Sequence, residues 1–243
     1  MNFCISLTTI PSRLKTIYKT IDSLNNQIIK PNIIYLSIPN EYKRFKKKIC
    51  ENELENINLE NVKIIRCEDY GPATSFLGPM QEIKGKYDFM IIVNDDHIYD
   101  KNMTEIFIKN YKKEKINYSF YIQKIFDINM AQTADGFLIK GDLLDKAYKF
   151  YKDYVEKNKN LRVDDDLWIS IYLQKIMKSK INTLISEFRE KTKKNTVYEV
   201  HTTTDSLLNN VHKRNVFWNR RKIAKMEIIK FKIRSYFNSF IQS

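Results

Sequence analysis

Short apolar runs alternate with segments of helical periodicity along the first part of the chain. The runs are rich in Ile and Val and stop at polar residues, which is typical of buried strands. They lie at residues 3–7, 33–38, 62–66 and 87–93. Between the first two runs, residues 14–24 place apolar side chains at helical spacing. Strands separated by helical segments imply βαβ units, so the pattern predicts an α/β fold with a mainly parallel sheet.

The second half of the chain continues this alternation with less regularity. A helix is expected at 104–111 and a strand at 118–125. A strand, a turn and a helix are expected over 137–151. The α/β pattern therefore extends through most of the chain.

Three consecutive aspartates, Asp164, Asp165 and Asp166, precede a predicted apolar helix at 167–177. Acidic residues at a helix start are stabilised by the helix dipole and by free backbone N–H groups. Capping of this kind accounts for one aspartate rather than three. The cluster is therefore a candidate for chemistry.

Polar clusters follow three of the predicted strands at the point where each strand ends. TTIPSR occupies 8–13, EDYGPATS occupies 68–75 and NDDH occupies 94–97. Loops beyond the carboxyl ends of parallel strands build the binding crevice, so we expect the three clusters to converge. Two adjacent carboxylates beside an imidazole need a positive charge between them, which a divalent Mn²⁺-like ion would supply. A solvated turn, favoured by Asn and Asp, is the plainer alternative, and the convergence speaks against it.

Composition limits the class of protein without choosing a function. With 243 residues, the chain is long enough for one large domain with a substantial core. Its net charge of +13 favours nucleotides, nucleic acids or anionic lipid headgroups equally. Cys4, Cys50 and Cys67 form neither a zinc pattern nor a disulfide framework, which favours a reducing compartment. No signal peptide or bilayer-spanning window is evident, so we expect a cytoplasmic protein, peripheral to a membrane at most.

The C-terminal segment is strongly basic. Residues 213–234 contain nine basic residues against one acidic residue, Glu227, and several apolar positions among them share a helical face. Such a helix can lie on an anionic membrane, or it can pack its apolar side on the domain, which is the favoured alternative. We expect a domain at 1–212 and a basic amphipathic extension at 213–243.

His201 lies where a strand-like Tyr-Glu-Val segment opens into Ser, Thr and Asn residues. A lone histidine in a polar loop is more often solvated than ligating. Contact with a metal or a phosphate is the alternative, because a metal at 94–97 needs a second ligand from elsewhere in the chain.

Several motifs recur in a specific order along residues 8–201. They are TTIPSRL, SLNNQ before PNIIYLSIP, DYGPATSFLGP, NDDHIY and DDLWIS. In this order and spacing the chain resembles the GT-A-fold glycosyltransferases, specifically a family-2-like group found in bacterial and large-virus genomes. The resemblance implies a Rossmann-like sheet flanked by helices. It also implies transfer of a sugar from a nucleotide diphosphate sugar, usually with Mn²⁺ or Mg²⁺.

By this resemblance, the NDDH segment takes the place of the family's Asp-x-Asp metal motif. Asp96 is then the direct ligand of the metal that bridges the diphosphate, with Asp95 or His97 assisting. His201 matches a late histidine that some members place on the metal. Asn94 stands where the family often has another aspartate, so the pair that forms the motif stays open.

Further positions of the resemblance surround the nucleotide sugar. The first loop meets the nucleotide through Thr8, Thr9, Pro11 and Arg13. Arg13 would pair with a phosphate. The base and ribose lie near Asp69, Tyr70 and Gly71. The wall between donor sugar and acceptor is formed by Ala134, Asp135 and Gly136.

Asp165 and Asp166 resemble the family's acidic catalytic pair. An inverting transferase needs a base that takes the acceptor's hydroxyl proton while the oxygen attacks the anomeric carbon. Adjacent acids in a partly dry cleft raise the pKa of a carboxylate toward the working range. We expect Asp166 to be this base, with Asp165 as the alternative, and the metal to stabilise the departing diphosphate.

The sequence therefore predicts a metal-dependent, inverting glycosyltransferase with a glycan, lipid-linked or protein acceptor and no nucleic-acid partner. A metal-dependent nuclease is the alternative enzyme class, because clustered Asp and His residues and a basic surface also serve phosphodiester cleavage. That alternative leaves GPATSFLGP unexplained. In a third class, a binding module without catalysis, both aspartate clusters are merely capped turns.

Overall fold

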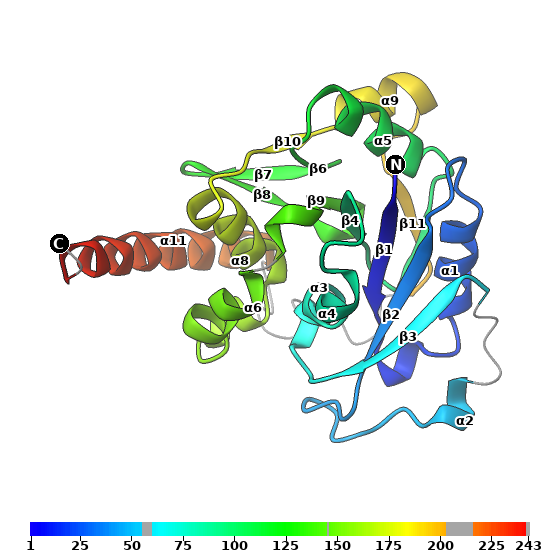
Figure 1. Ribbon diagram of the computed structural model, residues 1–243, viewed down its shortest axis with the longest axis horizontal. Coiled ribbons are helices and arrows are strands. Elements are labelled where there is room, and N and C mark those ends of the chain that lie inside the picture. Colours follow the sequence, from blue (N-terminus) through cyan, green and yellow to red (C-terminus); the bar gives the residue numbers. More distant parts are fainter. Residues whose placement is uncertain (55–59, 145, 203–215, 242–243) are drawn as a thin grey trace.

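A seven-stranded sheet forms the centre of the computed structural model, which describes residues 1–54, 60–144, 146–202 and 216–241 (Figure 1). The strand order is β10-β6-β9-β4-β1-β2-β3. Every neighbouring pair in this sheet is parallel except those of β9, which is antiparallel to β4 and β6. The strands are β1 (Phe3–Thr8), β2 (Ile33–Pro39), β3 (Val62–Cys67), β4 (Phe89–Ile92), β6 (Asn117–Ser119), β9 (Phe137–Lys140) and β10 (Ile181–Thr183). The predicted α/β class and mainly parallel sheet are confirmed.

Strand β4 explains why the predicted strands appear as continuous apolar runs. Ile91 belongs to the core on one side of the sheet, whereas Met90 and Ile92 belong to the core on the other side. All four residues of β4 are buried. Because helices cover both faces of a parallel sheet, its strands need apolar side chains at successive positions.

Two layers of helices cover the sheet (Figure 1). One layer contributes to the core that contains Ile91, and it consists of α1 (Ile17–Asn25), α2 (Glu51–Leu54), α5 (Met103–Lys113) and α9 (Ile185–Thr192). The other layer consists of α3 (Thr74–Leu77), α4 (Met80–Ile83), α6 (Ala147–Phe150), α7 (Lys159–Arg162), α8 (Asp165–Ile171) and α11 (Val216–Ile241). The π-helical turns η5 (Tyr151–Val155) and η6 (Tyr172–Ile176) continue α6 and α8. The helical periodicity predicted at 14–24 is observed in α1.

The prediction of a single strand at 118–125 is wrong, because this segment contributes to two strands. Its first part is β6 in the central sheet, whereas β7 (Ile122–Ile125) pairs with β8 (Ile128–Ala131) in a separate antiparallel ribbon. The hydroxyl of Ser119 donates a 2.9 Å hydrogen bond to the carbonyl of Tyr121 between the two strands. A local side-chain bond to the backbone of this kind competes with strand pairing.

A second ribbon connects distant parts of the chain near the NDDH segment. Strand β5 (His97–Tyr99) pairs antiparallel with β11 (Tyr198–Val200), and Val200 stands opposite His97. This pairing brings the residues around 200 beside the carboxyl end of β4.

The long helix α11 starts against the body of the molecule and extends away from it (Figure 1). Ala224 and Ile228 are buried in the same core as α8. The C-terminal segment therefore packs one apolar side on the domain, as the favoured alternative predicted. The predicted domain boundary at residue 212 lies outside the described residues. None of the helices in the described part of the chain combines the length and apolar character that a membrane-spanning segment needs.

Candidate functional site

The loops after β1, β3 and β4 converge on one pocket of about 650 Å³. This convergence follows from the parallel strands, whose carboxyl ends lie along the same edge of the sheet. Nine of the predicted site residues line the pocket: Thr8, Thr9, Arg13, Asp69, Gly71, Asp95, Asp96, Asp165 and Asp166. Five do not line it: Pro11, Tyr70, His97, Gly136 and His201. Both aspartate clusters thus face one cavity.

The first acidic cluster is closed by an arginine from the loop after β1. Arg13 lies in the 3₁₀ turn η1 (Pro11–Arg13), and its Nη1 is 2.7 Å from Asp95 Oδ1. Its Nη2 is 3.2 Å from Asp96 Oδ2. Thr9 adds a 2.7 Å hydrogen bond from its hydroxyl to Asp95. The positive charge that the two carboxylates need is therefore supplied in this structure by a guanidinium group.

Burial opposes the ionisation of both carboxylates of this cluster, but the net shifts of their pKa values differ. Burial raises the pKa of Asp95 above its ordinary value, against the effects of Arg13 and Thr9. Burial also opposes the ionisation of Asp96, but the hydrogen bond from His97 and the charges of His97 and Arg13 outweigh it and lower the pKa of Asp96. Asp96 is therefore the more readily ionised member of the pair, which suits the predicted role of metal ligand.

His97 lies behind Asp96 rather than in the pocket. Its Nδ1 contacts Asp96 Oδ1, and its ring packs edge-on against Tyr198 with centroids 3.9 Å apart. The ring also stacks on Tyr99. Its contacts hold the Asp96 side chain in place. The position of His97 thus favours support of the ligand over direct contact with a substrate.

His201 is brought beside this cluster by the β5–β11 ribbon. Its backbone N–H donates to the carbonyl of Asp96 at 2.9 Å. The hydroxyl of Thr20 donates to the carbonyl of Asp95 at 2.8 Å and lies 2.9 Å from His201 Nε2. Because the hydroxyl proton is already used, Nε2 must donate to Thr20, and Nδ1 then carries a lone pair. Burial lowers the pKa of His201, which keeps the ring neutral.

These donors fit a divalent metal in part. Nδ1 of His201 is buried and has no hydrogen-bond partner among the described residues, and the backbone N–H of the same residue is bonded to the carbonyl of Asp96. A neutral imidazole and an aspartate are both suitable ligands for Mn²⁺-like ions. Within the described residues, no three His, Cys, Asp or Glu side chains form a complete metal site. The protein would therefore supply part of the coordination shell and leave positions for a ligand.

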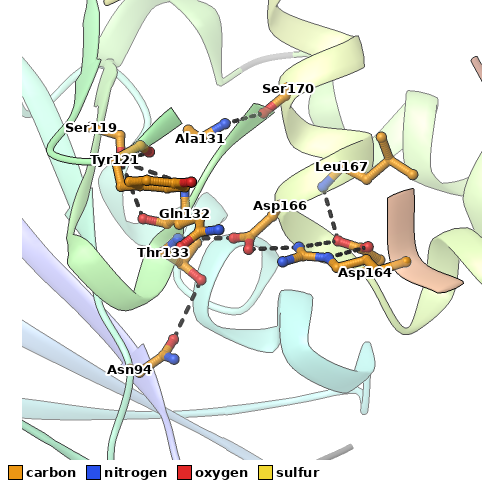
Figure 2. Close-up of polar contacts among 11 residues, drawn as sticks. Asn94, Ser119, Tyr121, Ala131, Gln132, Thr133, Asp164, Asp166, Leu167 and Ser170 are labelled. Carbon is orange, nitrogen blue, oxygen red and sulfur yellow. Dashed lines mark hydrogen bonds and ion pairs between the residues drawn. The ribbon is translucent and has the colours of Figure 1, made fainter. Parts of the chain in front are cut away.

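The second acidic cluster is closed by an arginine from α11. Arg220 donates from Nε to Asp164 Oδ2 at 2.8 Å and from Nη2 to Asp164 Oδ1 at 2.6 Å. The same Nη2 lies 2.8 Å from Asp166 Oδ2. Asp164 also caps α8 by accepting from the Leu167 N–H at 3.2 Å (Figure 2). Helix capping therefore accounts for Asp164, whereas the two aspartates after it face the pocket.

Thr133 connects the NDDH segment with the second acidic cluster. It lies in the 3₁₀ turn η3 (Thr133–Asp135), and its backbone N–H donates to Asp166 Oδ1 at 2.8 Å. Its hydroxyl donates to Asn94 Oδ1 at 3.3 Å (Figure 2). The turn predicted to form the wall between donor and acceptor is therefore hydrogen-bonded to the second cluster through its backbone and to the NDDH segment through its side chain.

The carboxylate of Asp165 differs from that of its neighbour. Asp166 accepts hydrogen bonds from Thr133 and Arg220, whereas the carboxylate of Asp165 has no hydrogen bond or ion pair with another side chain among the described residues and accepts from its own backbone N–H. Burial, followed by the charges of Asp166 and Asp164, raises the pKa of Asp165 well above its ordinary value. A carboxylate with a raised pKa and no side-chain partner is suited to accept a proton.

Asp135 lies between the two clusters, and charges from both of them act on its pKa. Burial, followed by the charge of Asp166, raises its pKa to about 6, while His97 acts in the opposite direction. The sequence placed this residue only in a wall. Asp135 is buried behind the pocket lining, which Thr133 and Ala134 of the same turn form.

The other predicted residues act mainly through the backbone. Asp69 accepts hydrogen bonds from the backbone N–H groups of Lys43 and Gly71, both at 2.8 Å. Gly71 has a φ of +65°, which favours glycine at this turn. Tyr70 points into the core against Tyr151, away from the pocket. We therefore find the loop after β3 at the pocket, with Tyr70 as one of its packing residues.

Pro11 and Gly136 shape the pocket from outside it. Pro11 begins the turn that carries Arg13. Gly136 has a φ of +89° and ends the turn of Thr133, with Phe107 so close that a Cβ atom would lie 3.1 Å from it. Both residues serve the conformation of the loops that carry the polar groups.

Sequence reasoning missed five side chains of the site. Arg220 stands 54 residues after Asp166 and is one of many basic residues, so no local signal marked it. Thr20 and Thr133 are single threonines whose roles depend on which carbonyl or carboxylate lies nearby. Lys43 and Arg44, from the lysine-rich segment after β2, also line the pocket and add positive charge.

Comparison with known proteins identifies the fold. No family model and no curated protein sequence matches the chain. Among solved structures, the mannosyltransferase PcManGT of Pyrobaculum calidifontis, in complex with GDP-Man and Mn²⁺, has a TM-score of 0.53 and 11% identity. S. aureus TarS 1–349 in complex with UDP has a TM-score of 0.54 and 13% identity. The chain has the GT-A fold that the sequence resemblance implied.

The similarities extend over only part of the length of these solved structures. The alignments cover 75% and 86% of this chain but only 54% and 63% of the mannosyltransferase and of TarS. A 4-diphosphocytidyl-2C-methyl-D-erythritol synthase from Anaerococcus prevotii is also similar, with a TM-score of 0.51, 15% identity and coverage of 75% and 87%. The same fold therefore carries more than one reaction, and the function has to be argued from the site.

Proposed function

We propose that the protein is a glycosyltransferase that uses a nucleotide diphosphate sugar as donor. One observation carries the proposal: Asp95 and Asp96 of the first cluster and Asp165 and Asp166 of the second line the same pocket of about 650 Å³. A pocket of this size accommodates a nucleotide-sized ligand. The GDP-Man bound to the mannosyltransferase and the UDP bound to TarS support this ligand class.

The donor diphosphate lies beside Asp95 and Asp96. Asp96 and His201 Nδ1 are the groups that would hold a divalent Mn²⁺ or Mg²⁺ ion, and the charge such an ion would supply there is the charge that a departing diphosphate needs. Arg13 neutralises the two carboxylates and pairs with a phosphate. Lys43 and Arg44 raise the local concentration of the anionic donor. The base and ribose lie toward Asp69 and the loop after β3.

Sugar transfer takes place beside Asp165 and Asp166. Asp165 accepts the proton of the acceptor hydroxyl while that oxygen forms a bond to the anomeric carbon. The bond between the anomeric carbon and the diphosphate oxygen breaks on the opposite face, so the transfer is inverting. Asp166 is held by Thr133 and Arg220 and positions this part of the pocket. This assignment reverses the order that the sequence favoured, because only Asp165 of the two has no side-chain partner among the described residues.

The acceptor is a glycan, a lipid-linked group or a protein that presents a hydroxyl to Asp165. The turn η3, whose Thr133 and Ala134 line the pocket, separates it from the donor sugar.

A thermal-shift screen tests the proposal. The chain is measured with UDP, GDP, CDP and the corresponding nucleotide sugars, with CTP and with an oligonucleotide, each with and without Mn²⁺. We expect one nucleoside diphosphate series to raise the melting temperature in a metal-dependent way, because a ligand that binds only the native state stabilises it. Stabilisation by oligonucleotides alone, lost as salt rises, would move the assignment to a nuclease. A response to CTP without one to any nucleoside diphosphate would move it to nucleotidyl transfer.

A further inference from the structure

Helix α11 has two apolar faces, of which only one is packed on the domain. On the packed face, Ala224 and Ile228 are buried, and Phe231 contacts the aromatic rings of Phe150 and Tyr154. An amphipathic helix that covers a domain normally presents a polar face to solvent. Here the opposite face also carries large apolar side chains.

The exposed apolar face is a continuous stripe. Met226, Ile229 and Ile233 are 41%, 47% and 52% exposed. They are spaced by three and four residues, so at 3.6 residues per turn they lie above one another. Ala224 and Ile228 fall on the other side of the helix by the same spacing. The stripe therefore lies on the side of α11 opposite the packed face.

Basic side chains border one edge of the stripe, together with another exposed aromatic ring. Phe126, at the turn between β7 and β8, is 49% exposed. Lys225 Nζ lies 5.8 Å and Lys232 Nζ 6.0 Å from the centroid of its ring. Lys232 also pairs with Asp127 at 2.7 Å. An apolar ring and two ammonium groups thus extend the stripe onto the adjacent ribbon.

Basic side chains also border the other edge. Lys230 and Arg234 line a polar hollow that also contains Lys157 and Lys159, with Asp153 as its carboxylate. Over its whole length α11 has seven basic residues against one acidic residue, and that residue, Glu227, is buried. The exposed face is therefore apolar at its centre and cationic at both edges.

We infer that this face, formed by Phe126, Met226, Ile229 and Ile233 with their bordering cations, binds the surface of an anionic lipid membrane. Apolar side chains enter the boundary between headgroups and acyl chains, while lysines and arginines pair with lipid phosphates. Nucleic acid needs cations and stacking rings, and it leaves three aliphatic side chains in water. A lipid surface satisfies both the apolar centre and the cationic edges, because it offers hydrocarbon beneath a layer of negative charge.

The membrane-facing surface adjoins the candidate active pocket. Lys159 lines both the polar hollow and the pocket, and Arg220 of α11 reaches the second acidic cluster. Membrane binding through α11 would hold the pocket close to the headgroup layer. If the proposed function is correct, a lipid-linked acceptor would meet the pocket in this orientation, but membrane binding itself does not depend on that function.

Co-sedimentation of the full chain with vesicles tests the inference. The vesicles contain phosphatidylcholine alone or phosphatidylcholine with phosphatidylglycerol. We expect binding to the anionic vesicles that weakens with salt, and a loss of about tenfold or more in a variant with Met226→Ser, Ile229→Ser and Ile233→Ser. The matched control is Tyr18→Ser with Ile28→Ser, two exposed apolar side chains outside this face, and it should bind like the wild type.

A charge variant separates the two contributions. Lys222→Gln with Lys225→Gln should weaken binding to anionic vesicles and flatten the salt dependence, while the melting temperature stays close to that of the wild type. Equal binding of the serine variant and the wild type would overturn the inference. So would wild-type binding to oligonucleotides that exceeds binding to vesicles, or a dimer that the serine variant abolishes while vesicles have no effect.

Discussion

The two acidic clusters of the pocket have similar parts but differ in how their carboxylates are paired. Each is a run of aspartates whose charge an arginine from another part of the chain offsets, Arg13 in one and Arg220 in the other. In the first cluster both carboxylates are paired. In the second, Arg220 takes Asp164 and Asp166 and leaves Asp165 without a side-chain partner among the described residues. The difference separates a cluster suited to hold charge from one suited to move a proton.

The two arginines also differ in the elements that carry them and in how readily a substrate could replace their carboxylate partners. Arg13 belongs to a short turn at the pocket edge, where an incoming phosphate can compete for it. Arg220 lies on a long helix with the same side-chain exposure as Arg13, 12%, and although burial opposes its charge, Asp164 and Asp166 outweigh that effect and raise its pKa above the ordinary value. We therefore expect substrate binding to rearrange the first cluster and leave the second one intact.

Removing the carboxylate of Asp165 should have the largest effect. Asp165→Asn should lower the turnover of the stabilising nucleotide sugar by about 10²–10⁴-fold, the usual contribution of a general base, while donor affinity stays unchanged. Asp166→Asn should lose less turnover and more stability, because it breaks the contacts with Arg220 and Thr133. Single-turnover rates and donor affinity, measured on both variants, check the prediction. A larger loss of turnover in Asp166→Asn would return the base to Asp166.

Removing the second arginine should destabilise the protein. Arg220→Met leaves Asp164 and Asp166 buried without compensation, and breaking a buried pair in this way costs about 3–5 kcal/mol. Arg220→Lys should recover part of this loss, because an ammonium group cannot reproduce the bidentate contact. Arg221→Met is the matched control, since Arg221 pairs with no carboxylate within the described residues. Denaturant unfolding of the three variants gives the comparison, and equal losses for the two Met variants would contradict it.

Asp135, the carboxylate between the two clusters, should affect how the free energy of unfolding depends on pH. Because folding raises the pKa of Asp135 from 3.8 to about 6, the folded state binds its proton more tightly than the unfolded state. The contribution of Asp135 to the free energy of unfolding has its full value below pH 3.8 and is lost as the pH rises through about 6. Relative to the wild type, Asp135→Asn should gain up to about 3 kcal/mol of unfolding free energy between pH 4 and pH 7. Asp22→Asn, at an exposed site on α1, should show no such gain, and a gain common to both would refute the assignment.

The part of the site that the sequence predicted is the part that local rules determine. Parallel strands and their carboxyl-end loops fixed the convergence of TTIPSR, EDYGPATS and NDDH on one pocket, as observed. The apolar runs of β1 to β4 located the strands, because both faces of the sheet are covered. The spacing at 14–24 located α1. Each of these features depends on residues close together in the chain.

The features that the sequence did not reveal depend on contacts between distant segments. Arg220 resembles every other arginine in the basic tail until α11 is placed beside α8. The preference for Asp166 over Asp165 was a matter of motif spacing, whereas the structure distinguishes them by which one Arg220 and Thr133 contact. The metal expected at Asp95 and Asp96 was argued from charge and from the resemblance to a metal motif, and the charge of Arg13 satisfies the electrostatic part of that argument.

The most direct test of the account is the affinity of Asp96→Ala for the nucleotide sugar that stabilises the wild type, titrated calorimetrically with and without Mn²⁺. We expect Mn²⁺ to tighten wild-type binding by about tenfold or more, or about 1.4 kcal/mol, and to have no effect on the variant. Asp69→Ala, at the other side of the donor pocket, should weaken binding while keeping the metal dependence. Unchanged affinity and metal dependence in Asp96→Ala would contradict the assignment of the first cluster to the donor.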